Sequence, residues 1–334
     1  MPVFANGEKE AALLKDTMRR VGARMSRQEF LFIVSNIYHA FESKNYKPWS
    51  GVYNDLKEAL KQCKEHLFAP ITILNVGCCA GYEAEVVREV FDSVDVRRIV
   101  LTDISPEMVR RARTRLAALY SQIEFRIGNI EDPSIGLFEL VITHNLIHRI
   151  ADLPRFFRTV SKVTLPGCYY LMGDEPSIRF YRNPECLAVY QEMRTIEERR
   201  KWADPRMWVD KLRRMIRPSE KEKGLFRRIN DRLRSQFGFT DDLTPREIVK
   251  LLHIHSPSNL PKDLHIDFDG FDWNELHRSY LQDFELVQVW TSDDMGGTNP
   301  SELPLRWQQL NDALREKYPI DGSNFTVLWK RRAL

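Results

Sequence analysis

The stretch ITILNVGCCAGYEAEVV, residues 71–87, decides the fold of this chain. It starts with a short β-rich apolar run, passes through a tight turn bounded by Gly77 and Gly81, and continues with apolar residues at helical spacing. We therefore expect a buried strand, a turn and the start of a helix. Two cysteines, Cys78 and Cys79, stand in the turn where a phosphate-binding loop would have glycine.

The same alternation continues to residue 175. Short runs rich in β-branched and aromatic residues are separated by stretches with apolar residues at three- and four-residue steps. Strands that alternate with helices indicate βαβ units, and therefore a parallel sheet with helices on both faces. The strand runs are ITILNV, RRIVLTDI, IEFRIGN, FELVITH and CYYLMGD, and the helical stretches are EAEVVREVF, SPEMVRRARTRLAALY and DLPRFFRTVSKV.

Two further strand runs, FELVQVWTS at 284–292 and NFTVLWKRR at 324–332, follow a long, charged, helix-rich segment. Two strands alone do not form a stable sheet, so we expect them to complete the earlier one. The predicted fold class is α/β: a doubly wound, Rossmann-like, mostly parallel seven-stranded sheet, with a helical N-terminal arm and a large helical insertion between strands 5 and 6. The expected domains are an arm or lid at 1–70, a core at 71–175 and 283–334, and a basic, helix-rich cap for the substrate at 176–282.

Composition places the chain among ordinary soluble globular proteins, with 334 residues, 43% hydrophobic and 29% charged. The first twenty residues carry charges throughout, so we expect neither a signal peptide nor a membrane span, and a cytoplasmic location. The five cysteines are an odd set without a CxxC pair, which argues against a disulfide framework and against a structural zinc site.

Positive charge is concentrated in one segment, although the whole chain has a net charge of only +3. Residues 199–234 contain fourteen Lys and Arg against five Asp and Glu, a local charge of +9. Such a block is either the solvated face of surface helices or a surface for an anionic substrate, an acidic carrier protein or RNA.

The turn at 77–81 does not have the spacing of a dinucleotide-binding loop. That fingerprint needs G-x-G-x-x-G so that the backbone can approach a pyrophosphate, whereas Cys79 and Tyr82 stand at its second and third glycine positions. A tight turn without those glycines indicates a cofactor that has no pyrophosphate. We interpret Cys78 and Cys79 as small buried thiols that fill space beneath the turn, the alternative being a reactive thiol.

With the turn in place after an apolar strand, the chain resembles the class I S-adenosylmethionine-dependent methyltransferases. Their first motif has an acidic residue and a Gly-x-Gly-x-Gly turn, to which Asn75, Gly77, Cys79 and Gly81 correspond here. Two positions depart from it: asparagine replaces the acidic residue, and cysteine replaces the middle glycine. The resemblance covers residues 71–175 and 283–330 and implies S-adenosyl-L-methionine as the cofactor.

The resemblance also implies further cofactor contacts after the second, third and fourth strands. Asp103 would accept the two ribose hydroxyls, although an Asp after a strand can also cap the next helix. Met108 would pack on the adenine or in the core. The remaining implied cofactor residues are Ile104, Asn129, Ile130 and Asn145.

Two histidines follow the fourth strand in THNLIHR, His144 and His148. A sulfonium is already a strong methyl donor, so the protein mainly aligns the acceptor and excludes water. A base helps when the acceptor carries a proton, and histidine suits that role at neutral pH. Both histidines are candidate catalytic bases, and packing or hydrogen bonding is the other interpretation of each.

Four more histidines lie between residues 251 and 277. The pair His253 and His255 would share one face of a strand, as metal ligands can, but no third ligand has diagnostic spacing. We therefore expect no metal. These four histidines either line the acceptor pocket or belong to the ordinary polar surface. They are His253, His255, His265 and His277.

The leading functional hypothesis is a methyltransferase that acts on a small molecule in specialised metabolism, with a homodimer as a possible assembly. Enzymes that methylate exocyclic base amines resemble Asp/Asn-Pro-Pro-aromatic after the fourth strand, whereas this chain has Thr143-His144-Asn145-Leu146, so a nucleic-acid substrate is disfavoured. The alternatives are an RNA- or carrier-protein-directed methyltransferase that uses the basic segment, and a non-catalytic or non-methylating protein that keeps the fold.

Overall fold

The computed structural model describes residues 50–117, 122–147, 150, 152–190, 192, 224, 227, 230–231, 233–235, 242–243, 270–291 and 304–333. The chain forms two compact units, Met1–Asn45 with Thr195–Phe268 and Tyr46–Arg194 with Asp269–Leu334. The sheet and all the helices named below belong to the second unit. The domain boundaries that the sequence suggests stay a prediction.

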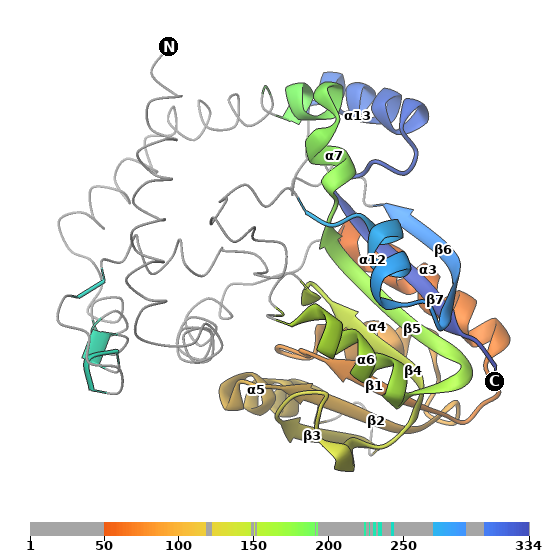
Figure 1. Cartoon of the computed structure of the whole chain (residues 1–334), viewed down its shortest axis with the longest axis vertical. Helices are drawn as coiled ribbons and strands as arrows, with labels where there is room; N and C mark the ends of the chain where they lie inside the picture. The colour runs from red at the N-terminus through yellow and green to blue at the C-terminus, as the bar shows by residue number, and fades with distance from the viewer. Residues whose placement is uncertain are drawn as a thin grey trace. The chain divides into compact units, whose positions relative to one another are not determined.

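Seven strands form one sheet with the order β3-β2-β1-β4-β5-β7-β6 (Figure 1). Strands β1 to β5 pair in parallel, and β7 is antiparallel to both β5 and β6. The predicted doubly wound, mostly parallel seven-stranded sheet is confirmed. The strands are β1 (Ile71–Val76), β2 (Val96–Asp103), β3 (Ile123–Ile127), β4 (Phe138–His144), β5 (Thr164–Pro176), β6 (Phe284–Thr291) and β7 (Asn324–Arg331).

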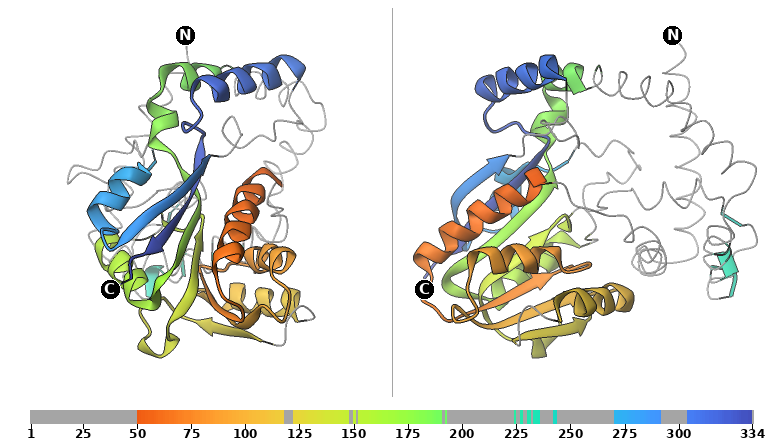
Figure 2. Two further views of the ribbon diagram at one scale, coloured as in Figure 1. Left: turned by 90° about the vertical axis from the view of Figure 1, so that its right-hand side faces the viewer. Right: turned by 180° about the vertical axis from the view of Figure 1, so that it is seen from behind.

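Helices cover both faces of this sheet, as Figure 2 shows from the side. One face carries α3 (Ser50–His66), α4 (Tyr82–Val90) and α5 (Pro106–Leu116); the other carries α6 (Leu153–Val163) and α12 (Trp273–Tyr280). The remaining elements are η1 (Pro133–Ile135), α7 (Ile178–Arg182) and α13 (Leu305–Lys317). None of the helices within the described residues is long and apolar enough to cross a membrane.

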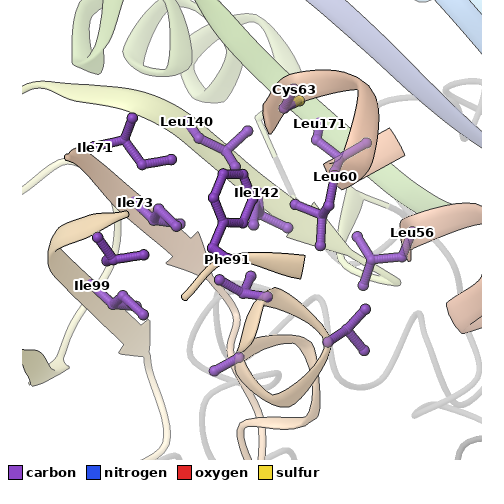
Figure 3. Close-up of a cluster of buried hydrophobic side chains, with 14 of the residues drawn as sticks. Leu56, Leu60, Cys63, Ile71, Ile73, Phe91, Ile99, Leu140, Ile142 and Leu171 are labelled. Atoms are coloured by element: carbon purple, nitrogen blue, oxygen red, sulfur yellow. The ribbon is translucent and has the colours of Figure 1, made fainter. Parts of the chain in front are cut away.

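The first face is closed by α3, which packs its apolar stripe on the sheet (Figure 3). Leu56, Leu60 and Cys63 recur at three- and four-residue steps and lie fully buried with Ile73 and Phe91. The helix lies within the segment 1–70 that the sequence predicts to be a helical arm, and burial of its apolar stripe explains its stability better than intrinsic propensity does.

The second face is built from aromatic rings. Phe157 stacks on Tyr280 at 5.5 Å, and Tyr170 stacks on Trp329 at 5.6 Å. The Tyr170 hydroxyl lies 2.8 Å from Oγ1 of Thr143, so each polar atom has its partner inside the core. The contacts among Thr143, Tyr170 and Trp329 join β4, β5 and β7.

The strand order reverses between β1 and β4, because β2 and β3 lie on one side of β1 while β4 and β5 lie on the other. In open α/β sheets ligands bind outside the carboxyl ends of the strands at such a reversal. The turns after β1, β2, β4 and β5 therefore define the candidate site.

Candidate functional site

The turn between β1 and α4 alternates between ordinary and left-handed backbone conformations. Gly77, Cys79 and Gly81 have positive φ angles of 70°, 44° and 84°. The amides of Gly77 and Cys78 both donate to the carbonyl of Thr102, at 2.8 and 3.0 Å, which ties the turn to the end of β2. Cys79 thus occupies a position that favours glycine, as the family motif implies.

The two cysteines of this turn have different environments. Cys78 is fully buried, and burial raises the pKa of its thiol well above the usual range, so it is an inert packing group. The interpretation as a buried space-filler is therefore correct for Cys78. It is wrong for Cys79, whose side chain is exposed because the left-handed backbone turns it away from the core.

Asp103 ends β2 and is held by two backbone amides. Its Oδ2 accepts a hydrogen bond from the amide of Cys79 at 3.0 Å, and its Oδ1 accepts one from the amide of Ser105 at 2.8 Å. The side chain of Ser105, not of Asp103, caps α5 by accepting from the amide of Met108. The carboxylate is therefore tied to the turn at 77–81, and helix capping does not account for it.

Other residues that the sequence implied for the cofactor lie around Asp103. Ile104 is a partly exposed apolar side chain at the strand end, whereas Met108 and Ile130 are buried. Asn129 is exposed, and its side-chain oxygen accepts from the amide of Glu131 at 3.0 Å in a local turn. The amide of Gly128 donates to the carbonyl of Asp103. This hydrogen bond holds the turn after β3 next to the turn after β2.

The turns after β4 and β5 are linked by carboxylates. Asn145 donates its side-chain amide to Oδ2 of Asp174 at 3.2 Å, and Asn324 of β7 donates to Oδ1 of the same residue. Oε1 of Glu175 accepts the amides of Leu146 at 2.7 Å and of Ile147 at 2.6 Å. The sequence interpretation missed Asp174 and Glu175, although their place in MGDEP at a strand end resembles that of Asp103.

Three residues other than glycine have a positive φ among those that the structure describes: Cys79, Asn145 and Asp174, the last two at 49° and 54°. All three lie at the carboxyl edge of the sheet, beyond or at the ends of β1, β4 and β5. A left-handed conformation costs such residues about 1 kcal/mol each. Its concentration at one edge is typical of a functional site.

His144 ends β4 and points into the protein. Its ring stacks on Tyr53 of α3 at 5.5 Å, and its Nδ1 lies 3.5 Å from Oε1 of Glu83 in α4. Burial lowers the pKa of His144 to about 4, so the ring is neutral at pH 7. Its role as a base stays a prediction, and His148 lies outside the described residues.

The other candidate histidines take no part in this edge as far as the structure describes them. His253, His255 and His265 lie outside the described residues, while His277 of α12 contacts the carbonyl of Phe284 at 3.0 Å and ties α12 to β6. Within the described part of the chain, no group of three or more His, Cys, Asp and Glu side chains is placed to hold a metal ion.

The donor set at the edge suits a positively charged cofactor. Asp103, Asp174 and Glu175 end two of its strands, Glu83 begins the neighbouring helix, and the described residues of the turns after β1 to β5 include no lysine or arginine. The carboxylates of Asp103, Asp174 and Glu175 would repel a pyrophosphate and attract a sulfonium or an ammonium. Asn75, at the end of β1, adds a buried side chain whose polar atoms have no partner among the described residues.

A family described as a methyltransferase domain matches residues 68–217. The match contains β1 to β5, α4 to α6 and every site residue named above except Tyr53 and Asn324.

Individual relatives are remote. Over 110 residues the chain is 24% identical to the non-reducing polyketide synthase SAT8 of Stachybotrys chartarum, which is 31% of this chain and 4% of that protein. The N-methyltransferase NodS of Bradyrhizobium japonicum WM9, solved with S-adenosyl-L-homocysteine, is 13% identical, with 89% of this chain and 98% of that chain covered and a TM-score of 0.45. The CMeT domain of the citrinin polyketide synthase is 22% identical, with 37% and 35% covered and a TM-score of 0.34.

Proposed function

We propose that this chain, which carries a class I S-adenosylmethionine-dependent methyltransferase domain within residues 68–217, transfers the methyl group of S-adenosylmethionine to a small-molecule acceptor. The match to a methyltransferase domain supports the family that the sequence resembles, and with it the cofactor of that family. The chain spans only 4% of the length of its curated relative, so the activity of the whole protein and its acceptor are proposals.

The observation that carries the proposal is the link between the cofactor turn and Asp103. The amide of Cys79 donates to Oδ2 of Asp103 at 3.0 Å and fixes the carboxylate beside the turn. A carboxylate oxygen can accept more than one hydrogen bond, so this group can bind ribose hydroxyls in addition to the backbone amides. Ile104, the exposed residue that follows Asp103, supplies apolar surface for adenine, and the buried Ile130 would support the site from beneath. The turn at 77–81 would lie against the methionine portion, where small residues and a left-handed backbone permit close approach.

When bound, S-adenosylmethionine supplies a methyl group on a positively charged sulfur, which needs no activation by the protein. The chain itself must position the acceptor and exclude water. His144 is the described candidate for accepting a proton from an acceptor hydroxyl, amine or acid. Its neutral ring has the required protonation state at pH 7, and its low pKa makes it a weak base, suited to an acidic acceptor proton.

A small-molecule acceptor is favoured by the similarity to a polyketide synthase. The block of +9 between residues 199 and 234 favours a second candidate, an acceptor carried on RNA or on an acidic carrier protein, but most of that block lies outside the described residues. A homodimer and a cytoplasmic location stay predictions.

Calorimetric titration with S-adenosylmethionine and with S-adenosylhomocysteine tests the cofactor site. We expect micromolar binding by the wild-type protein and loss of binding in Asp103→Ala. Asp95→Ala is the matched control, because Asp95 also accepts a backbone amide, that of Asp92 at 3.0 Å, but precedes β2 at the opposite end of the strand. A folded wild-type protein that binds neither ligand would overturn the proposal and leave a scaffold that has kept the fold.

Incubation with methyl-labelled cofactor tests the acceptor class. Separate reactions would contain a small-molecule extract, total RNA and an acyl carrier protein. Label in the small-molecule fraction is the expected result. Label that enters RNA or the carrier protein instead would move the function to the second candidate.

A further inference from the structure

A buried polar cluster lies on the α3 and α4 side of the sheet, at the ends of β1 and β4. It consists of Asn75, Glu83 and His144, which are 2%, 6% and 7% exposed. Oε1 of Glu83 lies 3.5 Å from Nδ1 of His144, and Tyr53 covers the imidazole ring. Asn75 shares this face because it pairs with Ile142 of β4, two residues before His144.

Space for the cluster is provided by Gly173 of β5. A Cβ atom at this position would lie 2.7 Å from Cδ2 of His144, closer than side chains pack. Gly173 pairs directly with His144 in the sheet, so the absence of its side chain is what lets the imidazole lie flat against the strand.

Several polar atoms of this cluster have no partner among the described residues. They are both side-chain atoms of Asn75, Oε2 of Glu83 and Nε2 of His144. A buried polar atom without a hydrogen bond costs about 1–3 kcal/mol, so four at one place need an explanation. Because the cluster adjoins the turn at 77–81, a ligand in the candidate cofactor site is the explanation closest at hand.

The charged surroundings of Glu83 are mostly negative. Asp103 from β2 and Asp174 from β5 act on Glu83 as negative charges, and Arg115 from α5 is the positive one. Arg115 is itself paired with Glu85 at 2.6 Å, which leaves little of its charge for Glu83. Among the described residues, His144 from β4 and Cys78 in the turn also interact with Glu83, and Tyr53 from α3 covers the ring of His144.

These surroundings keep the carboxyl of Glu83 neutral in the free protein. Burial above all, together with the charges of Asp103 and Asp174, raises the pKa of Glu83 to about 8. Burial also lowers the pKa of His144 to about 4. Near pH 7 the pair is a protonated carboxyl group beside a neutral imidazole, not an ion pair.

We propose that Glu83 recognises the positive charge of the cofactor: in the free protein its carboxyl keeps a proton beside His144, and that proton passes to solvent when S-adenosylmethionine binds. The inference rests on the proposed function. Only the O–H bond of the Glu83 carboxyl breaks, the proton goes to water or buffer, and the carboxylate that remains faces the cation.

Recognition of a positive charge by Glu83 makes the affinity for the cofactor differ from the affinity for the product. S-adenosylmethionine has a sulfonium in addition to its ammonium, whereas the sulfur of S-adenosylhomocysteine is neutral. A nearby positive charge favours ionised Glu83, and its loss after methyl transfer favours the return of the proton. Glu83 is therefore expected to strengthen binding of the cofactor relative to the product.

Calorimetry at pH 7 in two buffers of different ionisation enthalpy, phosphate and Tris, measures the protons released on binding. For the wild-type protein we expect nearly one proton released with S-adenosylmethionine, and clearly fewer with S-adenosylhomocysteine. Glu83→Gln should bind S-adenosylmethionine with almost no proton release. Glu85→Gln is the matched control in the same helix and should behave like wild type, since Glu85 is partly exposed and paired with Arg115.

The outcomes separate the two proposals. No binding of S-adenosylmethionine by the wild-type protein overturns the proposed function. Binding with equal proton release by wild type and Glu83→Gln overturns the role of Glu83 and leaves the proposed function standing.

If Glu83→Gln fails to fold, infrared difference spectroscopy on the wild-type protein decides. The carbonyl stretch of a protonated carboxyl group must disappear when S-adenosylmethionine binds, and an unchanged band contradicts the inference.

Discussion

The backbone amide of Cys79 donates to Oδ2 of Asp103 at 3.0 Å, which joins the turn after β1 to the residue that ends β2. The other carboxylate oxygen accepts the amide of Ser105 at 2.8 Å. Both carboxylate oxygens of Asp103 are therefore needed as acceptors for backbone amides of the protein itself, whether or not a ligand is bound.

Asp103→Asn tests this dual role. An asparagine places an NH₂ group against one of the two backbone amides, so we expect destabilisation by about 1–3 kcal/mol together with at least a tenfold loss of affinity for S-adenosylmethionine. Chemical denaturation and calorimetry measure the two effects. Asp95→Asn should leave the affinity unchanged, and an Asp103→Asn protein with wild-type affinity would remove Asp103 from the site.

Cys79→Gly tests the strain at the middle position of the turn. A left-handed cysteine costs about 1 kcal/mol, and glycine relieves it at an entropic cost of similar size, so we expect a change in unfolding free energy between zero and about 1 kcal/mol of stabilisation. Ala80→Gly is the control, because Ala80 has no positive φ and should lose up to about 1 kcal/mol through the greater freedom of the unfolded chain. Equal destabilisation of both variants would show that position 79 is not strained.

Gly173→Ala tests the space beside His144. The added methyl group must displace the imidazole from its place against Glu83 and Tyr53, so we expect a loss of about 1–3 kcal/mol in unfolding free energy. An alanine at Gly224, a helical position, would meet no atom of the described residues within 4 Å and serves as the control, for which no loss of stability is expected. Denaturation midpoints measure the effect, and a Gly173→Ala protein as stable as wild type would show that His144 is free to move.

The stability of the cofactor-free protein should fall as pH rises from 6.5 to 8. Glu83 has its pKa raised from 4.5 to about 8 on folding, so between these values the folded protein holds a proton that the unfolded chain has released. His144 has the opposite effect on stability, but only below pH 6.5. There the imidazole of the unfolded chain binds a proton, whereas the buried ring of the folded protein does so only near pH 4.

Urea denaturation at three pH values between 6.5 and 8 measures this dependence. The slope from Glu83 is at most about 1.4 kcal/mol per pH unit, and Glu83→Gln should remove it. Glu85→Gln should retain the slope of the wild-type protein. A slope that persists in Glu83→Gln would assign it to another group.

The order of strands and helices was predictable because each element has its own local periodicity. ITILNV and FELVITH became β1 and β4 with the predicted bounds, and the helix predicted over residues 105–120 is present as α5 at Pro106–Leu116. The packing partner of α3 could not be predicted from the sequence. Its apolar stripe shows that one face of the helix is buried, but not that this face closes the core against the sheet.

Part of the site was also readable from the chain. The spacing of Gly77, Cys79 and Gly81 and the place of Asp103 at a strand end are local features, and the structure joins them through hydrogen bonds. The exposure of Cys79 was predicted wrongly because burial depends on the direction in which a left-handed backbone turns the side chain, which composition does not report.

The amino-acid sequence alone determined the sheet and the tight turn at 77–81, since these depend on residues close together in the chain. Only the tertiary structure decided that Glu83 meets His144 and that Asp174 meets Asn145 and Asn324. Such contacts join residues that are distant in sequence. Their chemistry follows from burial, because removal from water sets which of these groups keeps a proton and which remains charged.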